Sequence, residues 1–309
     1  MKKKSKQRKP LIRRLGSAGF GPTAHGLLAL VLLFAGCSEE PPDTPSAQAK
    51  AKLAGDPAPT ALNLIVITLD TTRADALGSY GQQRPTTPNL DRLAEQGTQF
   101  LSCTTSAPST LPGHSSIFTG KHPHSHGARA NSGHVLSDAN QTLAEVLKSH
   151  GYATGAEIAA PVIGAHTRLD QGFDVYRDLK FSDIDKKSVI YSKKTDGNAS
   201  ELPEREASDI TKHGIRFLHQ HRKEKFFLWL HYFDAHQPYS PPLGFFEEVG
   251  NSDYHGEIRY IDDQIDRVLR ELEGLGLHER TLIVVTADHG EGRGQHSEPT
   301  HVFFVYDST

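Results

Sequence analysis

Asn63-Leu-Ile-Val-Ile-Thr-Leu69 is a continuous apolar and β-branched run, and it ends in an aspartate, Asp70. A run of this kind is typical of a strand that is buried on both faces, as in a parallel sheet. Two more runs share this character and also lead into aspartate and histidine: Phe226–Leu230, before His231, Asp234 and His236, and Thr281–Thr286, before Asp288 and His289. We therefore predict three buried strands whose carboxyl ends carry chemically active side chains.

The segments between these strands have helical patterns of apolar residues. They predict helices at residues 88–97, 142–149, 210–221 and 258–272. Strands that alternate with helices indicate βαβ units. The predicted fold class is α/β, with a mostly parallel sheet between helices. The acidic residues Asp262, Asp263 and Asp266 fall on the polar face of the last helix, where a solvated role is expected.

Composition excludes several classes of protein. The 34 Lys and Arg residues against 37 Asp and Glu give a net charge of −3, so no basic excess points to a nucleic-acid partner. Two cysteines exclude a disulfide scaffold and a four-thiolate zinc site. The 18 histidines are a supply of metal ligands and proton carriers.

The N-terminal segment predicts export. Residues 1–14 are densely basic, and the apolar run at residues 27–34 is shorter than the roughly 20 residues of a membrane-spanning helix. Phe34-Ala-Gly-Cys37 resembles a bacterial lipobox, in which the cysteine is lipidated. We expect a lipoprotein signal peptide at residues 1–36 and lipidation of Cys37, with an uncleaved membrane anchor as the alternative.

The remaining organisation follows from this prediction. Residues 37–61 predict a flexible tether because they are rich in Pro, Ala, Ser, Lys and Asp. Residues 62–309 would form the catalytic domain. The expected location is the bacterial cell envelope, on the outer membrane or facing the periplasm, with the membrane contacted through the N-terminal lipid. Cys103 would be the only thiol left.

The strand ends predict a metal site. In open α/β sheets, ligands bind beyond the carboxyl ends of the strands. Asp70, Asp288 and His289 are oxygen and nitrogen ligands of the kind that divalent metals use. One aspartate after a strand is usually a turn or cap residue, but three strands that end this way favour a shared site. We expect one divalent cation: Ca²⁺, Mn²⁺, Mg²⁺ or Zn²⁺.

A hydroxyl precedes another predicted helix. Pro112 suits a first helical turn, and Gly120 suits a helix end. Thr110 would lie just before this helix, among free backbone N–H groups at the positive end of its dipole. That place favours a nucleophile that attacks an anionic ester, with the metal lowering the pKa of the hydroxyl and the N–H groups holding the oxyanion. The alternative is a simple N-cap.

Four segments together resemble the sulfatase family within the alkaline-phosphatase superfamily. They are residues 69–78, 86–94, 227–239 and 286–291. The resemblance implies an alkaline-phosphatase-like fold and a metal-dependent hydrolase or transferase of sulfate or phosphate esters. Counted back from Thr119-Gly120, Thr110 takes the nucleophile position and His114 takes that of the family's arginine. Thr110 would also be a metal ligand.

The sequence departs from the family at the nucleophile. Family members oxidise a Cys or Ser at this position to formylglycine, but the β-carbon of Thr110 carries a methyl group. No formylglycine is therefore expected, and phosphoester chemistry is favoured. Thr71 stands where the family has a second aspartate.

The resemblance also implies substrate contacts. Lys121, His114 and His236 would bind the anionic substrate, and one of His236, His296 and His301 would protonate the leaving oxygen. A second cation held by Asp234, His236 and His301 is an alternative. The substrate would be a small-molecule, glycan or lipid-headgroup ester.

Two other functions stay open. One is a true sulfuric ester hydrolase that acts on sulfated glycans. The other is a non-catalytic surface lipoprotein that retains the fold. The chain ends soon after the predicted metal motif, so we also expect a fold that is truncated at the C-terminus.

Overall fold

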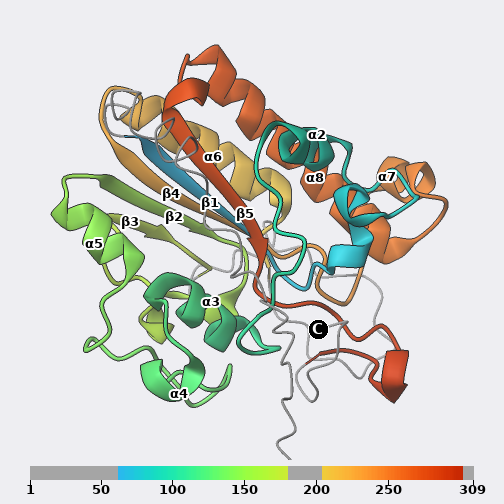
Figure 1. Cartoon of the computed structure of the whole chain (residues 1–309), viewed down its shortest axis with the longest axis horizontal. Coiled ribbons are helices and arrows are strands. Elements are labelled where there is room, and N and C mark those ends of the chain that lie inside the picture. Colours follow the sequence, from blue (N-terminus) through green and yellow to red (C-terminus); the bar gives the residue numbers. More distant parts are fainter. Residues whose placement is uncertain (1–61, 180–203, 302–309) are drawn as a thin grey trace, which may run out of the picture. The chain divides into compact units, whose positions relative to one another are not determined.

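The computed structural model describes residues 62–179 and 204–301, so the predictions for residues 1–61 lie outside the described part. It contains a five-stranded sheet in the order β3-β2-β4-β1-β5. The strands are β1 (Asn63–Leu69), β2 (Ala153–Ile158), β3 (Val175–Arg177), β4 (Phe226–Tyr232) and β5 (Thr281–Ala287) (Figure 1). All four neighbouring pairs are parallel. The predicted α/β class and parallel sheet are confirmed.

The register brings the strand ends together. β1 lies between β4 and β5, and Leu69 is paired with Tyr232 on one side and with Ala287 on the other. The residues that follow, Asp70 and Asp288, therefore leave neighbouring strands at the same edge of the sheet. This is the edge at which an open parallel sheet binds its ligands.

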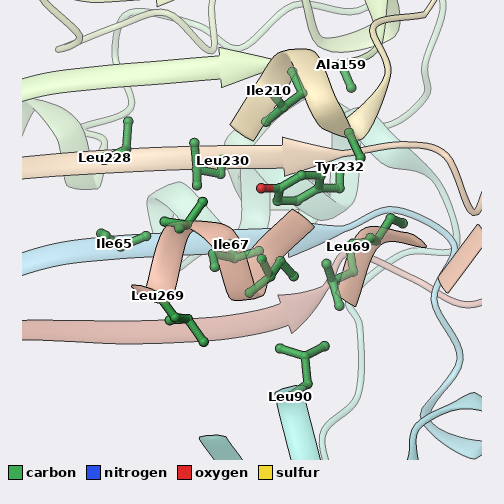
Figure 2. Close-up of a cluster of buried hydrophobic side chains, with 14 of the residues drawn as sticks. Ile65, Ile67, Leu69, Leu90, Ala159, Ile210, Leu228, Leu230, Tyr232 and Leu269 are labelled. Atoms are coloured by element: carbon green, nitrogen blue, oxygen red, sulfur yellow. The ribbon is translucent and has the colours of Figure 1, made fainter. Parts of the chain in front are cut away.

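One face of the sheet is covered by α6 (Ala207–His221), α8 (Asp253–Gly274) and α2 (Pro88–Gln96). Alternate residues of β1 and β4 point into this layer, as Figure 2 shows: Ile65, Ile67, Leu69, Leu228, Leu230 and Tyr232. They meet Ile210 of α6, Leu269 of α8 and Leu90 of α2. Full burial of each such side chain contributes about 1.5–3 kcal/mol, which anchors the two central strands.

The opposite face is covered by α3 (Thr110–Thr119) and α5 (Leu143–Ser149). Val66, Phe227 and Trp229 point into this second layer. The Trp229 ring lies 4.3 Å from that of Phe118 on α3, which holds the helix against the sheet. Both faces of β1 and β4 are thus buried, as their continuous apolar runs predict.

The predicted helices are present with shifted bounds. The helix predicted at 210–221 begins earlier, at Ala207, and that at 258–272 extends over Asp253–Gly274. Thr142 and Glu145 form a capping box at the start of α5. Two short α-helices are also present, α4 (Pro123–His126) and α7 (Leu243–Glu248). The 3-10 helices are η1 (Ala74–Ala76), η2 (Gly78–Tyr80), η3 (Pro161–Ile163), η4 (Ala165–Thr167), η5 (His278–Arg280) and η6 (Gln295–Ser297). Within residues 62–179 and 204–301, no helix combines the length and the apolar character needed to cross a membrane.

β2 has no continuous β-branched run and was not predicted, because Gly155 and Ala156 lie in its centre. Packing explains this composition. A Cβ atom on Gly155 would lie 2.4 Å from Cε2 of Phe217, so the ring occupies the space of a side chain. The small residues of β2 therefore let the Phe217 ring of α6 pack directly against the strand backbone.

Two sequence expectations are corrected. β5 is not buried on both faces: it is the last strand of the described sheet, and Leu282 and Val284 are 53% and 39% exposed. Asp262 is not solvated but fully buried. Its carboxylate accepts hydrogen bonds from the backbone N–H groups of Asn89 and Leu90. It therefore caps the first turn of α2 from the neighbouring helix α8.

Candidate metal centre and nucleophile

Asp70, Asp288 and His289 meet at the carboxyl edge of the sheet. One ligand atom from each lies within 4.8 Å of the other two, and all three side chains are buried. It is the only group of three or more such ligands in the part of the chain that the structure describes. The predicted convergence of β1 and β5 on one site is thus present.

A strained turn presents Asp70. The next residue, Thr71, has a φ of 52°, a left-handed conformation that costs a β-branched residue about 1–3 kcal/mol. The Tyr254 hydroxyl on α8 donates to the Thr71 carbonyl at 2.8 Å. This contact holds the chain in the turn, so the carboxylate stays at the strand end.

Local hydrogen bonds orient His289. Its Nδ1 lies 2.8 Å from the Gly290 carbonyl, which can only accept, so Nδ1 carries the proton. Burial lowers the pKa of His289 well below its usual value, so the ring is neutral. The lone pair of Nε2 then faces Asp288 Oδ2 at 3.3 Å and Thr110 Oγ1 at 3.4 Å. This is the tautomer that a metal ligand needs.

Two carboxylate oxygens in the cluster accept no hydrogen bond: Asp70 Oδ1 and Asp288 Oδ2. Burial raises the pKa of Asp70 to about 7, and it raises the pKa of Asp288 well above its usual value. Two neighbouring buried carboxylate groups that each have one oxygen without a donor are costly unless a cation lies between them. The donor set, two carboxylate oxygens and one imidazole nitrogen, therefore fits a divalent cation.

Thr110 is the first residue of α3, and it is buried next to the cluster. Close packing of α3 against the end of β5 places it there. A Cβ atom on Gly113 would lie 3.0 Å from the Asp288 carbonyl oxygen, so a residue without a side chain lets the helix approach. Helix α3 ends at Thr119, and Gly120 follows with a φ of 66°. The predicted helix and its stop at Gly120 are confirmed.

The expected oxyanion donors at this helix start are not free. The Leu111 N–H donates to Asn131 Oδ1 at 2.8 Å, and the Gly113 N–H donates to the Ser109 carbonyl at 2.9 Å. Pro112 has no N–H group. The N–H groups of Leu111 and Gly113 are therefore engaged, one by the Asn131 side chain and one by the Ser109 carbonyl, and they are not available to an oxyanion.

His114 does not face a substrate. The ring is fully buried, its Nδ1 donates to the Thr110 carbonyl at 2.8 Å, and its Nε2 accepts from Thr68 Oγ1 at 3.1 Å. Trp229 Nε1 in turn donates to Thr68 Oγ1 at 2.9 Å. The predicted substrate contact is corrected: His114 supports the helix turn that carries Thr110.

His231 lies in the site although its sequence position predicted no specific role for it. Its Nδ1 accepts from the Ala159 N–H at 3.2 Å, and its Nε2 donates to Asp70 Oδ2 at 3.2 Å. Burial lowers the pKa of His231 to about 3, so the ring stays neutral. Its place at the end of the second apolar run was the only signal in the sequence. The sequence of this run does not show that β4 pairs with β1, which is what places His231 beside Asp70.

A second group of side chains adjoins the cluster. The His301 ring lies 4.5 Å from that of His289 and 5.1 Å from that of His236. Nδ1 of His301 is 3.1 Å from Glu291 Oε1. Burial opposes a charge on His301, but the hydrogen bond and charge of Glu291 raise its pKa overall. His236 stacks on Phe233, and burial lowers its pKa to about 4.

Three other predicted residues lie elsewhere. His296 is exposed on η6. Lys121 is exposed and donates to Asn140 Oδ1 at 2.9 Å, so its ammonium is held by the loop before α5. Asp234 Oδ1 accepts from the Ala207 N–H, and Asp234 forms no three-ligand group with His236 and His301 within the described ranges. The geometry therefore does not support the alternative of a second cation.

The chain is similar to known proteins over most of its described length. The family model described as Sulfatase matches residues 62–304. An ulvan-active sulfatase from Formosa agariphila is 28% identical over 271 residues, which cover 76% of this chain and 52% of that protein. The chain spans about half the length of the curated relatives it matches.

Solved structures share the fold. A protein of the alkaline phosphatase superfamily from Vibrio parahaemolyticus has a TM-score of 0.58 at 23% identity, covering 74% of this chain and 55% of that one. A protein solved in complex with its substrate, D-glucosamine-2-N,6-O-disulfate, has a TM-score of 0.62 at 21% identity, covering 77% and 67%. At these identities the likeness concerns the fold.

Proposed function

The chain belongs to the sulfatase family, and from this premise we propose that the whole protein is a metal-dependent hydrolase of sulfate or phosphate esters with Thr110 as its nucleophile. One observation carries the proposal. The Thr110 hydroxyl lies 3.4 Å from His289 Nε2, next to two buried carboxylates that each have an oxygen without a hydrogen-bond donor. A hydroxyl beside a set of cation ligands is an activated-nucleophile arrangement.

The proposed ligands are Asp70 Oδ1, Asp288 Oδ2, His289 Nε2 and Thr110 Oγ1. A divalent cation bound there would lower the pKa of the Thr110 hydroxyl and offset charge on the ester oxygens. The mixed oxygen and nitrogen set is compatible with Ca²⁺, Mn²⁺, Mg²⁺ or Zn²⁺.

We assign the steps of the reaction to three residues: Thr110, His301 and His236. The Thr110 hydroxyl gives up its proton to water, and its oxygen attacks phosphorus or sulfur in line. The bond from phosphorus or sulfur to the leaving oxygen breaks as a covalent ester forms on Thr110, and water then hydrolyses this ester. His301 donates a hydrogen bond to the leaving oxygen from Nε2, because Glu291 occupies its Nδ1. His236 lies next to the His301 ring, where it would contact the anionic substrate.

The identity of the nucleophile favours phosphoesters. Formylglycine forms from Cys or Ser, and the β-carbon of Thr110 carries a methyl group. The hydroxyl of a threonine can still form a phosphate ester, which water then hydrolyses.

A sulfuric ester hydrolase that acts on sulfated glycans is the second candidate, and the comparisons favour it. The Formosa relative is an ulvan-active sulfatase, and one structural neighbour has a disulfated glucosamine as its substrate. A non-catalytic role is not favoured, because the cation ligands and Thr110 are all present and buried together.

The test uses the full chain and three small substrates: 4-nitrophenyl phosphate, bis(4-nitrophenyl) phosphate and 4-nitrophenyl sulfate. We expect metal-dependent turnover of at least one of them. Thr110→Ala should lower kcat at least about a thousandfold, whereas the matched variant Thr110→Ser keeps the hydroxyl and measurable activity. Undiminished turnover by Thr110→Ala would overturn the nucleophile assignment.

Lipidation at Cys37 is a separate proposal that rests on the lipobox-like residues 34–37. It places the protein in the bacterial cell envelope, with residues 37–61 as the tether of a catalytic domain at residues 62–309. Labelling of expressing cells with a clickable palmitate analogue tests it. Incorporation into the wild type and none into Cys37→Ser is the expected result, and equal incorporation into both would contradict the proposal.

A further inference from the structure

A pocket of about 630 Å³ lies outside the metal cluster. It is lined by Ser106, His122, Pro123, His124 and Arg129. The lining offers a guanidinium, two imidazoles and a hydroxyl, and it contains no carboxylate. These are hydrogen-bond donors of the kind that hold sulfate, phosphate or carboxylate groups, and a guanidinium can bind such groups through two parallel bonds.

The Arg129 guanidinium makes few contacts within the described residues. It is exposed, and its one hydrogen bond runs from Nη2 to the His124 carbonyl at a long 3.4 Å. It forms no ion pair with a carboxylate of residues 62–179 or 204–301. The rings of His122 and His124 stack almost in parallel, 5.9 Å apart, so they form one wall of the pocket. The guanidinium therefore has donors left for a ligand.

Both sides of the pocket are tied to the candidate active site. Ser106 follows Thr105, whose hydroxyl donates to the Asp288 carbonyl at 2.5 Å. Ser106 lies four positions before Thr110, so their Cα atoms are at most about 14 Å apart. The pocket is thus within reach of one extended ligand that also reaches the nucleophile.

The second side is held by Asn131, two residues after Arg129. Its Oδ1 accepts from Ser109 Oγ and from the Leu111 N–H, the residues on either side of Thr110. His126 of α4 also lies 3.1 Å from Ser116 Oγ of α3, and Figure 1 shows the two helices next to each other. The pocket and the nucleophile are therefore parts of one packed unit.

We propose that this pocket is an anion subsite, which binds a second sulfate or other oxyanion group of a polyanionic oligosaccharide whose ester reacts at Thr110. The inference rests on the proposed function and adds a binding site for a second anionic group of the substrate. Each donor that an oxyanion gains from Arg129 strengthens binding of the substrate without touching the reacting group. Loss of the subsite should therefore change KM and leave kcat unchanged.

The experiment compares Arg129→Gln with Arg216→Gln in the full-length protein. Arg216 is an exposed arginine on α6, the helix layer on the opposite face of the sheet, so its variant loses the same charge elsewhere. The probes are a synthetic tetrasaccharide with two sulfate esters, the same tetrasaccharide with one, and 4-nitrophenyl sulfate and phosphate.

For Arg129→Gln we expect KM for the disulfated tetrasaccharide to rise about tenfold, the size of one charge-assisted hydrogen bond. KM for the monosulfated sugar and the nitrophenyl esters should not change, and Arg216→Gln should match the wild type throughout. An equal KM for the disulfated sugar in both variants, or an equal rise for all substrates, would overturn the subsite.

Binding separates this proposal from the function on which it rests. If the wild type turns over none of the esters, the proposed function fails. In that case, calorimetric titration with the disulfated tetrasaccharide measures its binding to each variant without turnover. A Kd that is about tenfold weaker for Arg129→Gln than for Arg216→Gln supports the subsite, and an equal Kd contradicts it.

Discussion

His231 Nε2 lies 3.2 Å from Asp70 Oδ2, and the Ala159 N–H fixes the ring in the tautomer that donates to this oxygen. The bond satisfies one oxygen of the carboxylate and leaves Oδ1 without a donor. Asp70 is thereby held in one orientation, with its free oxygen available to the cluster. Such outer hydrogen bonds orient metal ligands and tune their affinity.

His231→Leu should therefore weaken metal binding about 10–100-fold, because Asp70 loses the donor that orients it. His231→Gln is the informative partner variant, since its amide can donate to Oδ2 and should restore part of the affinity. Isothermal titration of the metal-free protein with Mn²⁺ measures both. His213→Gln, at a half-buried position of α6 away from the metal cluster, serves as the control. Wild-type affinity in His231→Leu would show that the bond does not position Asp70.

Metal binding should stabilise the folded protein. The cation offsets two buried carboxylates, so the free energy of unfolding should rise by about 2.7 kcal/mol when the free metal is at 100 times its Kd. Differential scanning calorimetry with and without Mn²⁺ or Ca²⁺ measures this increase.

Asp288→Asn should remove that increase and should also make the metal-free protein more stable than metal-free wild type at neutral pH, because it removes a carboxyl group whose pKa burial raises well above its usual value. A metal-dependent rise in Tm that persists in Asp288→Asn would exclude Asp288 as a ligand.

Gly113→Ala should displace the end of β5 from α3. The added methyl group meets the Asp288 carbonyl oxygen at 3.0 Å, and overpacking of this kind costs about 1–3 kcal/mol. We expect lower metal affinity and a lower kcat, because Thr110 and Asp288 move apart. Gly244→Ala on α7 is the matched control, since nothing lies within 4 Å of its added Cβ. Equal kinetics in the two variants would contradict close packing at Gly113.

Asp262 should make stability depend on pH. Burial raises its pKa to about 6 in the folded protein, whereas the unfolded chain has the ordinary value of 3.8. Between these values the folded state holds a proton that the unfolded state has lost, so stability falls as pH rises from about 4 to about 6.

Asp262→Asn cannot ionise and should gain up to about 2 kcal/mol relative to wild type between pH 4 and pH 7. Urea unfolding of both proteins at the two pH values measures this difference. A difference that is independent of pH would mean that the Asp262 carboxyl group has the same pKa in the folded and unfolded states.

The sequence predicted the parts of the site that local chemistry defines. Strand β1 has the predicted bounds because its apolar, β-branched run fits one structure only, and the residue after it is Asp70. Thr110 and Gly120 mark the helix α3 because proline and glycine constrain the backbone locally. Asp288 and His289 were identified in the same way, as ligand residues after an apolar strand.

The roles of other residues depended on contacts between distant segments. The sequence predicts His114 as a substrate contact, but contacts with Thr68 and Trp229 bury it. The sequence predicts a solvated Asp262, but its buried carboxylate accepts hydrogen bonds from the first turn of α2. β2 lacked a strand pattern because Phe217 fills the space above Gly155.

The sequence by itself determined the fold class, the ligand types and the nucleophile candidate, because each is a property of a short segment and its chemistry. Tertiary structure alone decided that β1 lies between β4 and β5. That order places His231 beside Asp70, and the close approach of α3 places Thr110 beside Asp288 and His289. Strand order and helix approach are set by which side chains fill the space between elements far apart in the chain. No single segment carries that information.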